Sequence, residues 1–320
     1  MMPLQNTAQT CLSHETQPRS LQQAMQTIQA RICAQGDLPN AHVQQQLKIV
    51  DALAAFGLGR FLITHRGLNG YWTRYMAGLD PHFGLSTGVN PEGKPLSELE
   101  QWMLSRSRPA YVLPTRMREV QNILQNMLQD DMVLASVPCG AMDDLLRLDF
   151  STYHNVHLVG IDVDPHSLQL AERNAKERGL SSKVELIERD AWSLEAHERF
   201  DALVCHGLTA YEPNLKRVQV LYEGFYRALK PGGIFLTHLS TLPPKEDPQS
   251  SWNIDAINMK DIAHDEIIFR YVLNLKPWHN RRTQQQIKEL LHNAGFANIR
   301  IKLDKRGICP AVIAKKSDPL

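Results

Sequence analysis

The spacing of apolar residues divides the chain into two parts. From about residue 20 to residue 129 they recur every three or four positions, as on one face of an amphipathic helix, without a convincing strand. These runs are too short, and too often broken by Gly and Pro, for a coiled coil. We therefore predict a helical N-terminal domain over residues 1–128. The faces expected to be buried are Leu21, Met25, Ile28 and Ile32; Val43, Leu47, Val50 and Ala54; Leu96, Leu99 and Met103; and, after Pro114, Val120, Ile123, Leu124, Met127 and Leu128.

From residue 131 the pattern changes to short apolar runs that alternate with helical stretches such as 165–178 and 214–229. Such alternation is typical of βαβ units, so we predict an α/β fold with a doubly wound parallel sheet. Asp164-Pro165 is a good helix start, and Gly179 is placed to end the same helix. The predicted strands are 132–137, 156–162, 184–189, 200–206 and 234–239, followed by a closing hairpin of 298–303 and 309–316.

Composition restricts the function classes. The chain has 320 residues, of which 43% are hydrophobic and 22% charged, so a long disordered protein is excluded. Its net charge of +1 gives no global field that favours nucleic acid or anionic lipid.

The cysteines and the N-terminus indicate the compartment. The five cysteines contain no CxxC pair, which argues against a disulfide framework and against a zinc site of the paired-cysteine type; we predict no metal. The first residues are polar, without the pattern of a signal peptide, and no apolar stretch is long enough to cross a bilayer. We predict a cytoplasmic protein without a membrane span. The cysteines are Cys11, Cys33, Cys139, Cys205 and Cys309.

Candidate chemistry stands where the predicted strands end. The first is followed by a tight turn that contains Gly140, the second ends in Asp162, 22 residues later, and the third in Asp190-Ala191-Trp192. A glycine turn lets backbone approach a ligand, and a carboxylate at the second strand can accept from vicinal ribose hydroxyls. A carboxylate followed by an aromatic ring suits a purine. Each feature alone also has a structural interpretation: an ordinary turn, a surface Asp, a core Trp.

Together, VLASVPCG, LVGIDVD, RDAW, FDALVCHG and LKPGG resemble the class I methyltransferases that use S-adenosylmethionine. The resemblance implies a seven-stranded sheet of order 3-2-1-4-5-7-6 with strand seven antiparallel, and S-adenosylmethionine as cofactor, released as S-adenosylhomocysteine. It assigns the ribose to Asp162, the adenine to Asp190-Ala191 and the methionine portion to the 136–140 loop. The expected cofactor residues are Ser136, Pro138, Cys139, Gly140, Asp162, Val163, Asp190, Ala191, Trp192 and His206.

The first loop departs from the pattern of the family, which reads acidic-x-Gly-x-Gly-x-Gly. Here only the middle glycine, Gly140, is present, and Ser136 stands where an acid helps to organise the amino-acid end of the cofactor. We hypothesise that Asp143 and Asp144 replace that acid. A dinucleotide-binding dehydrogenase would need a GxGxxG turn, which the chain lacks, and no GxxxxGK[ST], HExxH or GxSxG motif occurs.

Methyl transfer needs alignment of the acceptor more than a specific catalytic group, so catalytic residues leave a weak trace. The candidates are His206 and Tyr211, which follow the fourth predicted strand. For the acceptor we consider Arg66, Tyr71, Trp72 and Arg74, in a segment dense in polar and aromatic groups. Packing between helices is the structural alternative for that segment.

The sequence therefore predicts a helical substrate cap, 1–128, on a methyltransferase core, 129–320, whose insertion 240–282 shapes the acceptor pocket. Within that insertion, DEIIFRYVLNLKPW is a helix or a strand that covers the sheet. The predicted function is methylation of a small molecule, on an oxygen or a carboxylate. The alternative is a non-catalytic methyltransferase-like module that recognises a protein partner through its helices. Balanced charge and the lack of an Asn-Pro-Pro-aromatic motif disfavour nucleic acid; the oligomeric state, a homodimer included, stays open.

Overall fold

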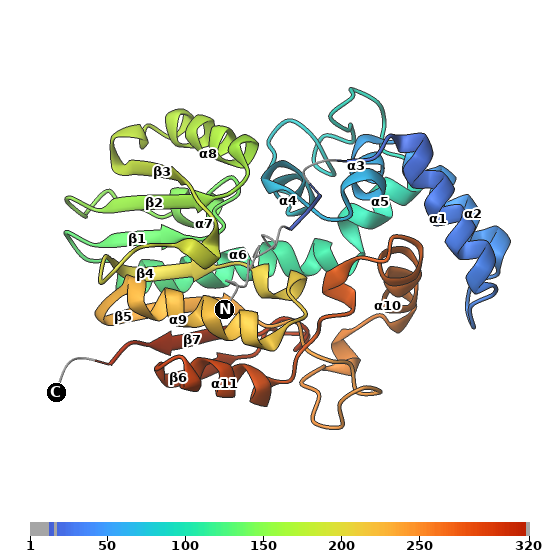
Figure 1. Ribbon diagram of the computed structural model, residues 1–320. Helices are drawn as coiled ribbons and strands as arrows, with labels where there is room; N and C mark the ends of the chain where they lie inside the picture. Colours follow the sequence, from blue (N-terminus) through green and yellow to red (C-terminus); the bar gives the residue numbers. More distant parts are fainter. Residues whose placement is uncertain (1–12, 16–17, 318–320) are drawn as a thin grey trace, which may run out of the picture.

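The computed structural model describes residues 13–15 and 18–317, which form a seven-stranded sheet beside a group of helices (Figure 1). The strand order is β3-β2-β1-β4-β5-β7-β6; β1 to β5 are parallel, and β7 is antiparallel to both of its neighbours. The α/β fold, its strand order and the reversed last strand are thus confirmed. The strands are β1 (Val133–Ser136), β2 (His157–Asp162), β3 (Val184–Glu188), β4 (Phe200–Cys205), β5 (Leu229–His238), β6 (Ala297–Lys302) and β7 (Ala311–Lys315).

Helices cover both faces of this sheet because neighbouring strand residues point to opposite sides. Ala135 of β1 joins a core under α9 and α11, whereas Leu134 joins a core under α6, α7 and α8. The helices are α1 (Leu21–Gln35), α2 (Val43–Ala54), α3 (Gly57–His65), α4 (Gly70–Met76), α5 (Glu98–Ser105), α6 (Arg108–Met127), α7 (Asp143–Leu146), α8 (Pro165–Glu177), α9 (Leu215–Ala228), α10 (Met259–Asp265) and α11 (Gln284–Asn293).

The ends of α8 follow the predicted signals. The Asp164 carboxylate accepts a hydrogen bond from the His166 N–H at 3.0 Å, and Pro165 is the first helical residue. Gly179 lies just past the end with φ +68°, a left-handed conformation that glycine adopts without strain. This helix therefore begins at the carboxyl end of β2, next to Asp162.

Helix α6 begins earlier than predicted. The apolar pattern after Pro114 predicts a start there, but the helix runs from Arg108 and carries Pro114 in its interior. Ser107 provides the N-terminal cap, because its Oγ accepts from the Ala110 N–H at 3.3 Å. The extra turns extend α6 beyond the sheet toward α5 (Figure 1).

The N-terminal helices share a core with a distant segment. Residues of α1, α2, α3 and α5 pack together with Ile268, Phe269, Val272 and Trp278. These four lie in the segment predicted to cover the sheet as a helix or a strand. That prediction is wrong about the location: η5 (Glu266–Val272) is a π-helix in the helical core, since its apolar side chains meet α2.

The fifth strand begins earlier than the predicted 234–239, because the segment LKPGG before it belongs to β5. Phe200 pairs with Leu229 and Ala202 with Ile234, so Pro231-Gly232-Gly233 bulges out between two pairs. Because proline cannot donate to a ladder, a bulge is the place in a strand where it fits.

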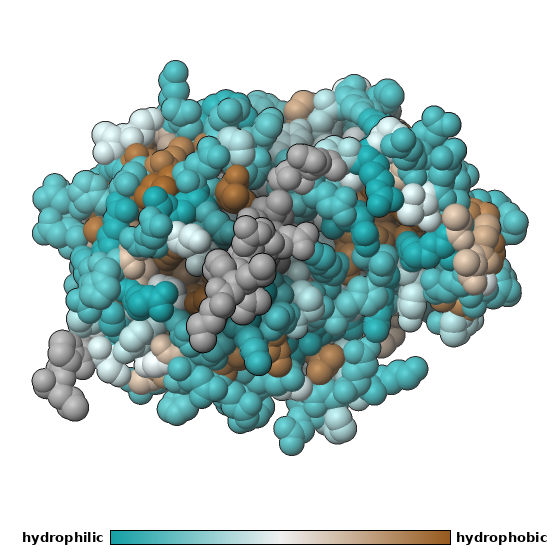
Figure 2. Space-filling model, viewed as in Figure 1, coloured by the Kyte–Doolittle hydropathy of each residue, from teal (hydrophilic) through white to brown (hydrophobic). Residues whose placement is uncertain are grey.

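The face of the molecule shown in Figure 2 is mostly polar. Hydrophilic residues cover most of the face in Figure 2, with apolar residues visible in hollows between them. Among the helices of residues 13–15 and 18–317, none combines the length and the apolarity that crossing a membrane would require.

Candidate functional site

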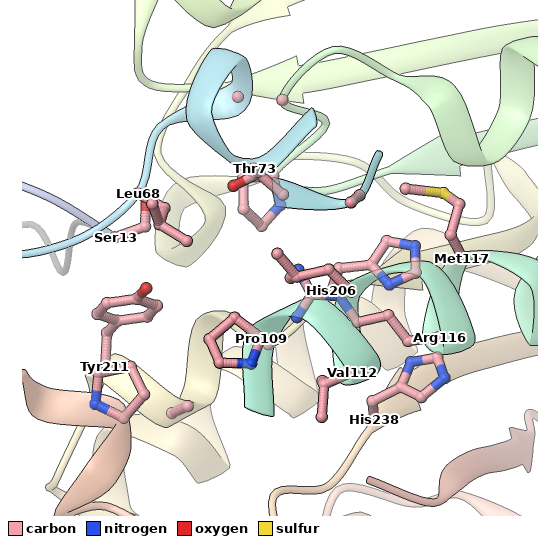
Figure 3. Close-up of a pocket in the computed structure, with 18 of the residues that line it drawn as sticks. Ser13, Leu68, Thr73, Pro109, Val112, Arg116, Met117, His206, Tyr211 and His238 are labelled. Carbon is pink, nitrogen blue, oxygen red and sulfur yellow. The ribbon is translucent and has the colours of Figure 1, made fainter. Parts of the chain in front are cut away.

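A cavity of about 210 Å³ lies at the carboxyl ends of the parallel strands, between the sheet and the helical part (Figure 3). Its walls come from α4, α6, the segments after β1, β2, β4 and β5, and residues 277–282. In doubly wound sheets ligands bind at this edge. A second, narrower cavity of about 20 Å³ adjoins it over β2 and β3.

The turn after β1 is held from both sides. Gly140 has φ +52°, and its N–H donates to Oδ2 of Asp162 at 2.9 Å. On the other side α4 begins at Gly70, where a Cβ would come within 2.9 Å of the Gly140 Cα. Because only hydrogen fits there, the helical part rests directly on this glycine turn. Pro138, Cys139 and Gly140 line the larger cavity.

Asp162 joins the two cavities. Its side chain is buried and accepts from the N–H groups of Gly140 (2.9 Å) and Asp164 (3.0 Å). Burial raises the pKa of this carboxyl, although those backbone hydrogen bonds lower it. A carboxylate has about four acceptor positions, so it can still accept hydrogen bonds from the hydroxyls of a ribose. Asp162 lines both cavities, as a residue that holds the centre of an extended nucleoside would.

The narrow cavity contains most of the predicted adenine residues. Asp190, Ala191 and Val163 line it. Trp192 does not line either cavity: its Nε1 donates to the carbonyl of Arg217 at 2.8 Å, and its ring packs against the sheet core. The structure thus brings the acid of this motif to the site, and turns the aromatic ring away from it.

Ser136 does not line either cavity; it positions an acid that does. Its Oγ donates to Oδ2 of the buried Asp144 at 2.7 Å, and the same oxygen lies 3.3 Å from Nε2 of His206. Asp143, next to it, pairs with Arg147 at 2.8 Å and lies 3.5 Å from Nε of Arg74. Asp143 and Asp144, which we hypothesise to replace the missing acid of the first loop, therefore both line the larger cavity.

The far half of the cavity, over β4 and β5, contains His206, Tyr211, His238 and Arg116 (Figure 3). The two imidazole rings are nearly parallel, with centroids 5.6 Å apart. Burial lowers the pKa of both histidines, that of His238 well below the usual value, since Arg116 and the neighbouring ring add to the effect. Asp144 opposes the shift at His206. Both rings are thus neutral near pH 7.

Of the four residues predicted to bind the acceptor, one lines the larger cavity and three do not. Arg74 lines the cavity, with its Nε buried. Arg66, Tyr71 and Trp72 do not line either cavity: Arg66 donates to the Asn274 carbonyl at 3.2 Å, and Trp72 packs edge-on between Tyr71 and Tyr75. Aromatic packing, the structural alternative for this segment, describes Tyr71 and Trp72.

Several cavity residues were missed by the sequence analysis. Arg116 and the apolar residues Pro109, Val112, Leu113 and Met117 recur at helical spacing along α6 and all line the cavity. An earlier start of α6 would have revealed this face. His238, at the end of β5, could have been found by the same strand-end rule that found Asp162. Ser13 and His14 line both cavities, and no motif marks them.

His238 predicts a pH dependence of stability. Its pKa is lowered in the folded chain, so between the unfolded value of about 6.5 and the lower folded value only the unfolded state binds the proton. Acidification within this window therefore destabilises the fold, by at most about 1.4 kcal/mol per pH unit for this group. We expect the free energy of unfolding in urea to fall less between about pH 6.5 and 5 in His238→Gln than in the wild type. Equal slopes would contradict the prediction.

The strand order with β7 reversed, the glycine turn after β1 and the carboxylates after β2 and β3 together define the class I methyltransferases. A family model described as a methyltransferase domain matches residues 128–295, just over half of the chain. The chain belongs to this family. The recognition made from the strand ends is confirmed, and with it S-adenosylmethionine as the cofactor of the family.

Three relatives show how far the similarity reaches. A solved structure of a possible exported protein from Bordetella parapertussis is 36% identical, with a TM-score of 0.84 over 93% of this chain and 95% of that chain. Sterol methyltransferase-like 1 of Botryococcus braunii is 28% identical over 103 residues, 32% of this chain and 26% of the relative. The ubiquinone/menaquinone biosynthesis C-methyltransferase UbiE of Sinorhizobium fredii is 25% identical over 50% of this chain and 62% of the relative. The chain spans about a quarter of the length of the sterol relatives.

Proposed function

We propose that the protein transfers the methyl group of S-adenosylmethionine to a small molecule in the larger cavity. The observation that carries this proposal is the cavity itself, which continues from the glycine turn and Asp162 to the two neutral histidines at β4 and β5. A nucleoside cofactor bound over β1 to β3 would direct its sulfur toward that second half.

In this proposal the residues that follow each strand bind a different part of the cofactor. Asp162 holds the ribose, Asp190 and Ala191 the adenine, and Gly140 with Asp144 the amino-acid end. Val163 and Pro138 complete the wall of the narrow cavity. Bound there, S-adenosylmethionine supplies an activated methyl group on a sulfonium, so that transfer is an in-line displacement.

His206 is the candidate general base. It is neutral near pH 7, because burial lowers its pKa, and its Nε2 lies 3.3 Å from the Asp144 carboxylate, which would stabilise the imidazolium. When the acceptor is a hydroxyl, its oxygen forms the new bond to the methyl carbon as the carbon–sulfur bond breaks, and the proton passes to His206. An oxygen or carboxylate acceptor is our first choice. The relatives named for C-methylation make carbon the alternative.

The helices before residue 129 and the 240–282 insertion act in this proposal as a cap that excludes water and shapes the acceptor site. Arg74, Arg108 and Trp278 bring both segments to the cavity wall. The cytoplasmic location stays a prediction.

Calorimetric titration with S-adenosylhomocysteine tests cofactor binding, and incubation with S-adenosylmethionine and a library of small hydroxylated, carboxylated and enolisable compounds tests transfer. Products identified by mass spectrometry distinguish oxygen from carbon methylation. Absence of cofactor binding up to about 1 mM would overturn the proposal, since a free energy of about 4 kcal/mol is still detected there. Binding without transfer to any compound would favour the non-catalytic module.

The segment 13–15 makes a further prediction about the cofactor. A Cβ on Gly67 would lie 1.8 Å from the carbonyl oxygen of Ser13 and 3.0 Å from the Cα of His14, while the Glu15 N–H donates to the His65 carbonyl at 2.7 Å. Gly67→Ala must therefore displace a segment that lines both cavities. We expect S-adenosylhomocysteine to bind about 10-fold more weakly, mainly through faster dissociation measured by surface plasmon resonance.

Gly224→Ala is the matched control for that experiment. Gly224 lies in α9, where a Cβ would meet only the Arg227 side chain at 3.8 Å, so the cofactor affinity should not change. Equal dissociation rates in the Gly67 variant and the wild type would show that the segment 13–15 does not retain the cofactor.

A further inference from the structure

Arg116 is an arginine of the cavity wall that contacts no carboxylate of the residues the structure describes. Arg116 projects from α6 into the half of the cavity over β4 and β5, and its Nη1 lies 2.9 Å from the point where Gly207 would carry a Cβ. Its Nε is fully buried and makes no hydrogen bond. Within residues 13–15 and 18–317, no carboxylate oxygen lies within 4.0 Å of its guanidinium nitrogens.

The other three arginines of the cavity wall are already engaged. Arg74 lies 3.5 Å from Asp143, and Arg108 lies 3.4 Å from Asp265. Arg282 donates to the backbone carbonyl of Thr209 at 2.7 Å. Arg116 is thus the arginine of this wall that, among the described residues, contacts neither a carboxylate nor a backbone carbonyl, so an anion that reaches its partly buried guanidinium would be stabilised there.

The surroundings of Arg116 indicate what kind of anion fits. His206 and His238 beside it are neutral, so they can donate hydrogen bonds but add no positive charge. Apolar side chains of the same face of α6, among them Val112 and Met117, line the cavity next to it (Figure 3). A planar guanidinium binds a carboxylate through two parallel hydrogen bonds. A phosphate dianion would need a second cation, and the other arginines are engaged.

We propose that the methyl acceptor is a carboxylic acid with an apolar body, whose carboxylate binds Arg116 and receives a further hydrogen bond from His238. This inference rests on the proposed function and names its substrate class. Arg116 stands at Gly207, after β4, whereas the amino-acid end of the cofactor is assigned to Gly140 and Asp144, after β1. The acid therefore occupies the acceptor half, and Arg116 selects it.

Two matched pairs of probes test the inference: benzoate against benzamide, and octanoate against octanamide, each titrated by calorimetry into protein saturated with S-adenosylhomocysteine. We expect the wild type to bind at least one acid about 10-fold or more tightly than its amide. Arg116→Gln should remove this preference, and Arg116→Lys, which retains the charge without the planar fork, should retain part of it. Arg118→Gln, at an exposed position of the same helix, is the control and should bind as the wild type does.

Four results would overturn the inference: no preference for the acid with either pair, a preference that persists in Arg116→Gln, tighter binding of inorganic phosphate than of both carboxylates, or a loss of more than about 10-fold in S-adenosylhomocysteine affinity in Arg116→Gln. The last would place Arg116 on the carboxylate of the cofactor. The acids and amides are also titrated into protein without S-adenosylhomocysteine, so that the preference for the acid is measured even if that molecule does not bind. Failure of S-adenosylhomocysteine to bind the wild type would then contradict the proposed function, while the acid preference would still test the role of Arg116.

Discussion

Replacing Asp162 by alanine is expected to weaken S-adenosylhomocysteine binding by about 100-fold or more, the largest effect on the cofactor that we predict. Hydrogen bonds to a charged group contribute about 1.5–3 kcal/mol each, and the carboxylate would make two with the ribose. The substitution also removes the acceptor of the Gly140 N–H at 2.9 Å, so the glycine turn loses its support. Calorimetric titration of the variant and the wild type measures the ratio of dissociation constants.

Asp149→Ala is the control for this experiment, because Asp149 is exposed and accepts a local hydrogen bond from the Ser151 N–H at 2.9 Å. Its affinity for S-adenosylhomocysteine should equal that of the wild type. A dissociation constant for the folded Asp162→Ala variant within about 3-fold of the wild type would show that this carboxylate does not hold the ribose. Circular dichroism establishes that the variant is folded.

Asp265→Ala is expected to destabilise the protein by about 3–5 kcal/mol, the range for breaking a buried ion pair by removing one partner. The Asp265 carboxylate is 1% exposed; it accepts from the Arg108 N–H at 2.8 Å and from Nε1 of Trp278 at 2.7 Å, and pairs with the Arg108 guanidinium at 3.4 Å. Alanine leaves two buried donors and a buried cation without it. Urea denaturation, followed by tryptophan fluorescence and circular dichroism, measures the change in unfolding free energy.

Asp255→Ala serves as the stability control, since this carboxylate is exposed and should change the unfolding free energy by less than about 0.5 kcal/mol. A loss of under about 1 kcal/mol in Asp265→Ala would mean that Glu266, 3.6 Å from the Arg108 guanidinium, compensates for the missing charge. The prediction would then be wrong.

The strand-end residues could be predicted from the sequence because the carboxyl ends of parallel strands meet at one edge. Gly140, Asp162 and Asp190 follow three neighbouring strands, so recognising the strands was enough to bring them together. The order of the sheet came from the resemblance to a family. The sequence itself carries only local periodicity, which does not determine which strands are neighbours.

Side-chain direction and long-range packing could not be predicted in this way. The same motif that places Asp190 at the site turns the Trp192 ring into the core, because the ring finds the Arg217 carbonyl and an apolar wall there. Arg116 follows an interior proline, which conceals that α6 continues in both directions. Phe269 packs against the N-terminal helices, although no local sequence pattern connects these two segments.

The packing of η5 against the N-terminal helices determines when those helices can reach their final structure during synthesis. Helices α1 to α5 leave the ribosome well before Ile268, Phe269 and Val272, so their core lacks these residues until roughly 160 further residues have been made. Strands β1 to β5 are synthesised in between. Helices α1 to α5 are therefore translated before these strands but reach their final packing only after the strands have been made, and until then their exposed apolar faces are candidate binding sites for chaperones.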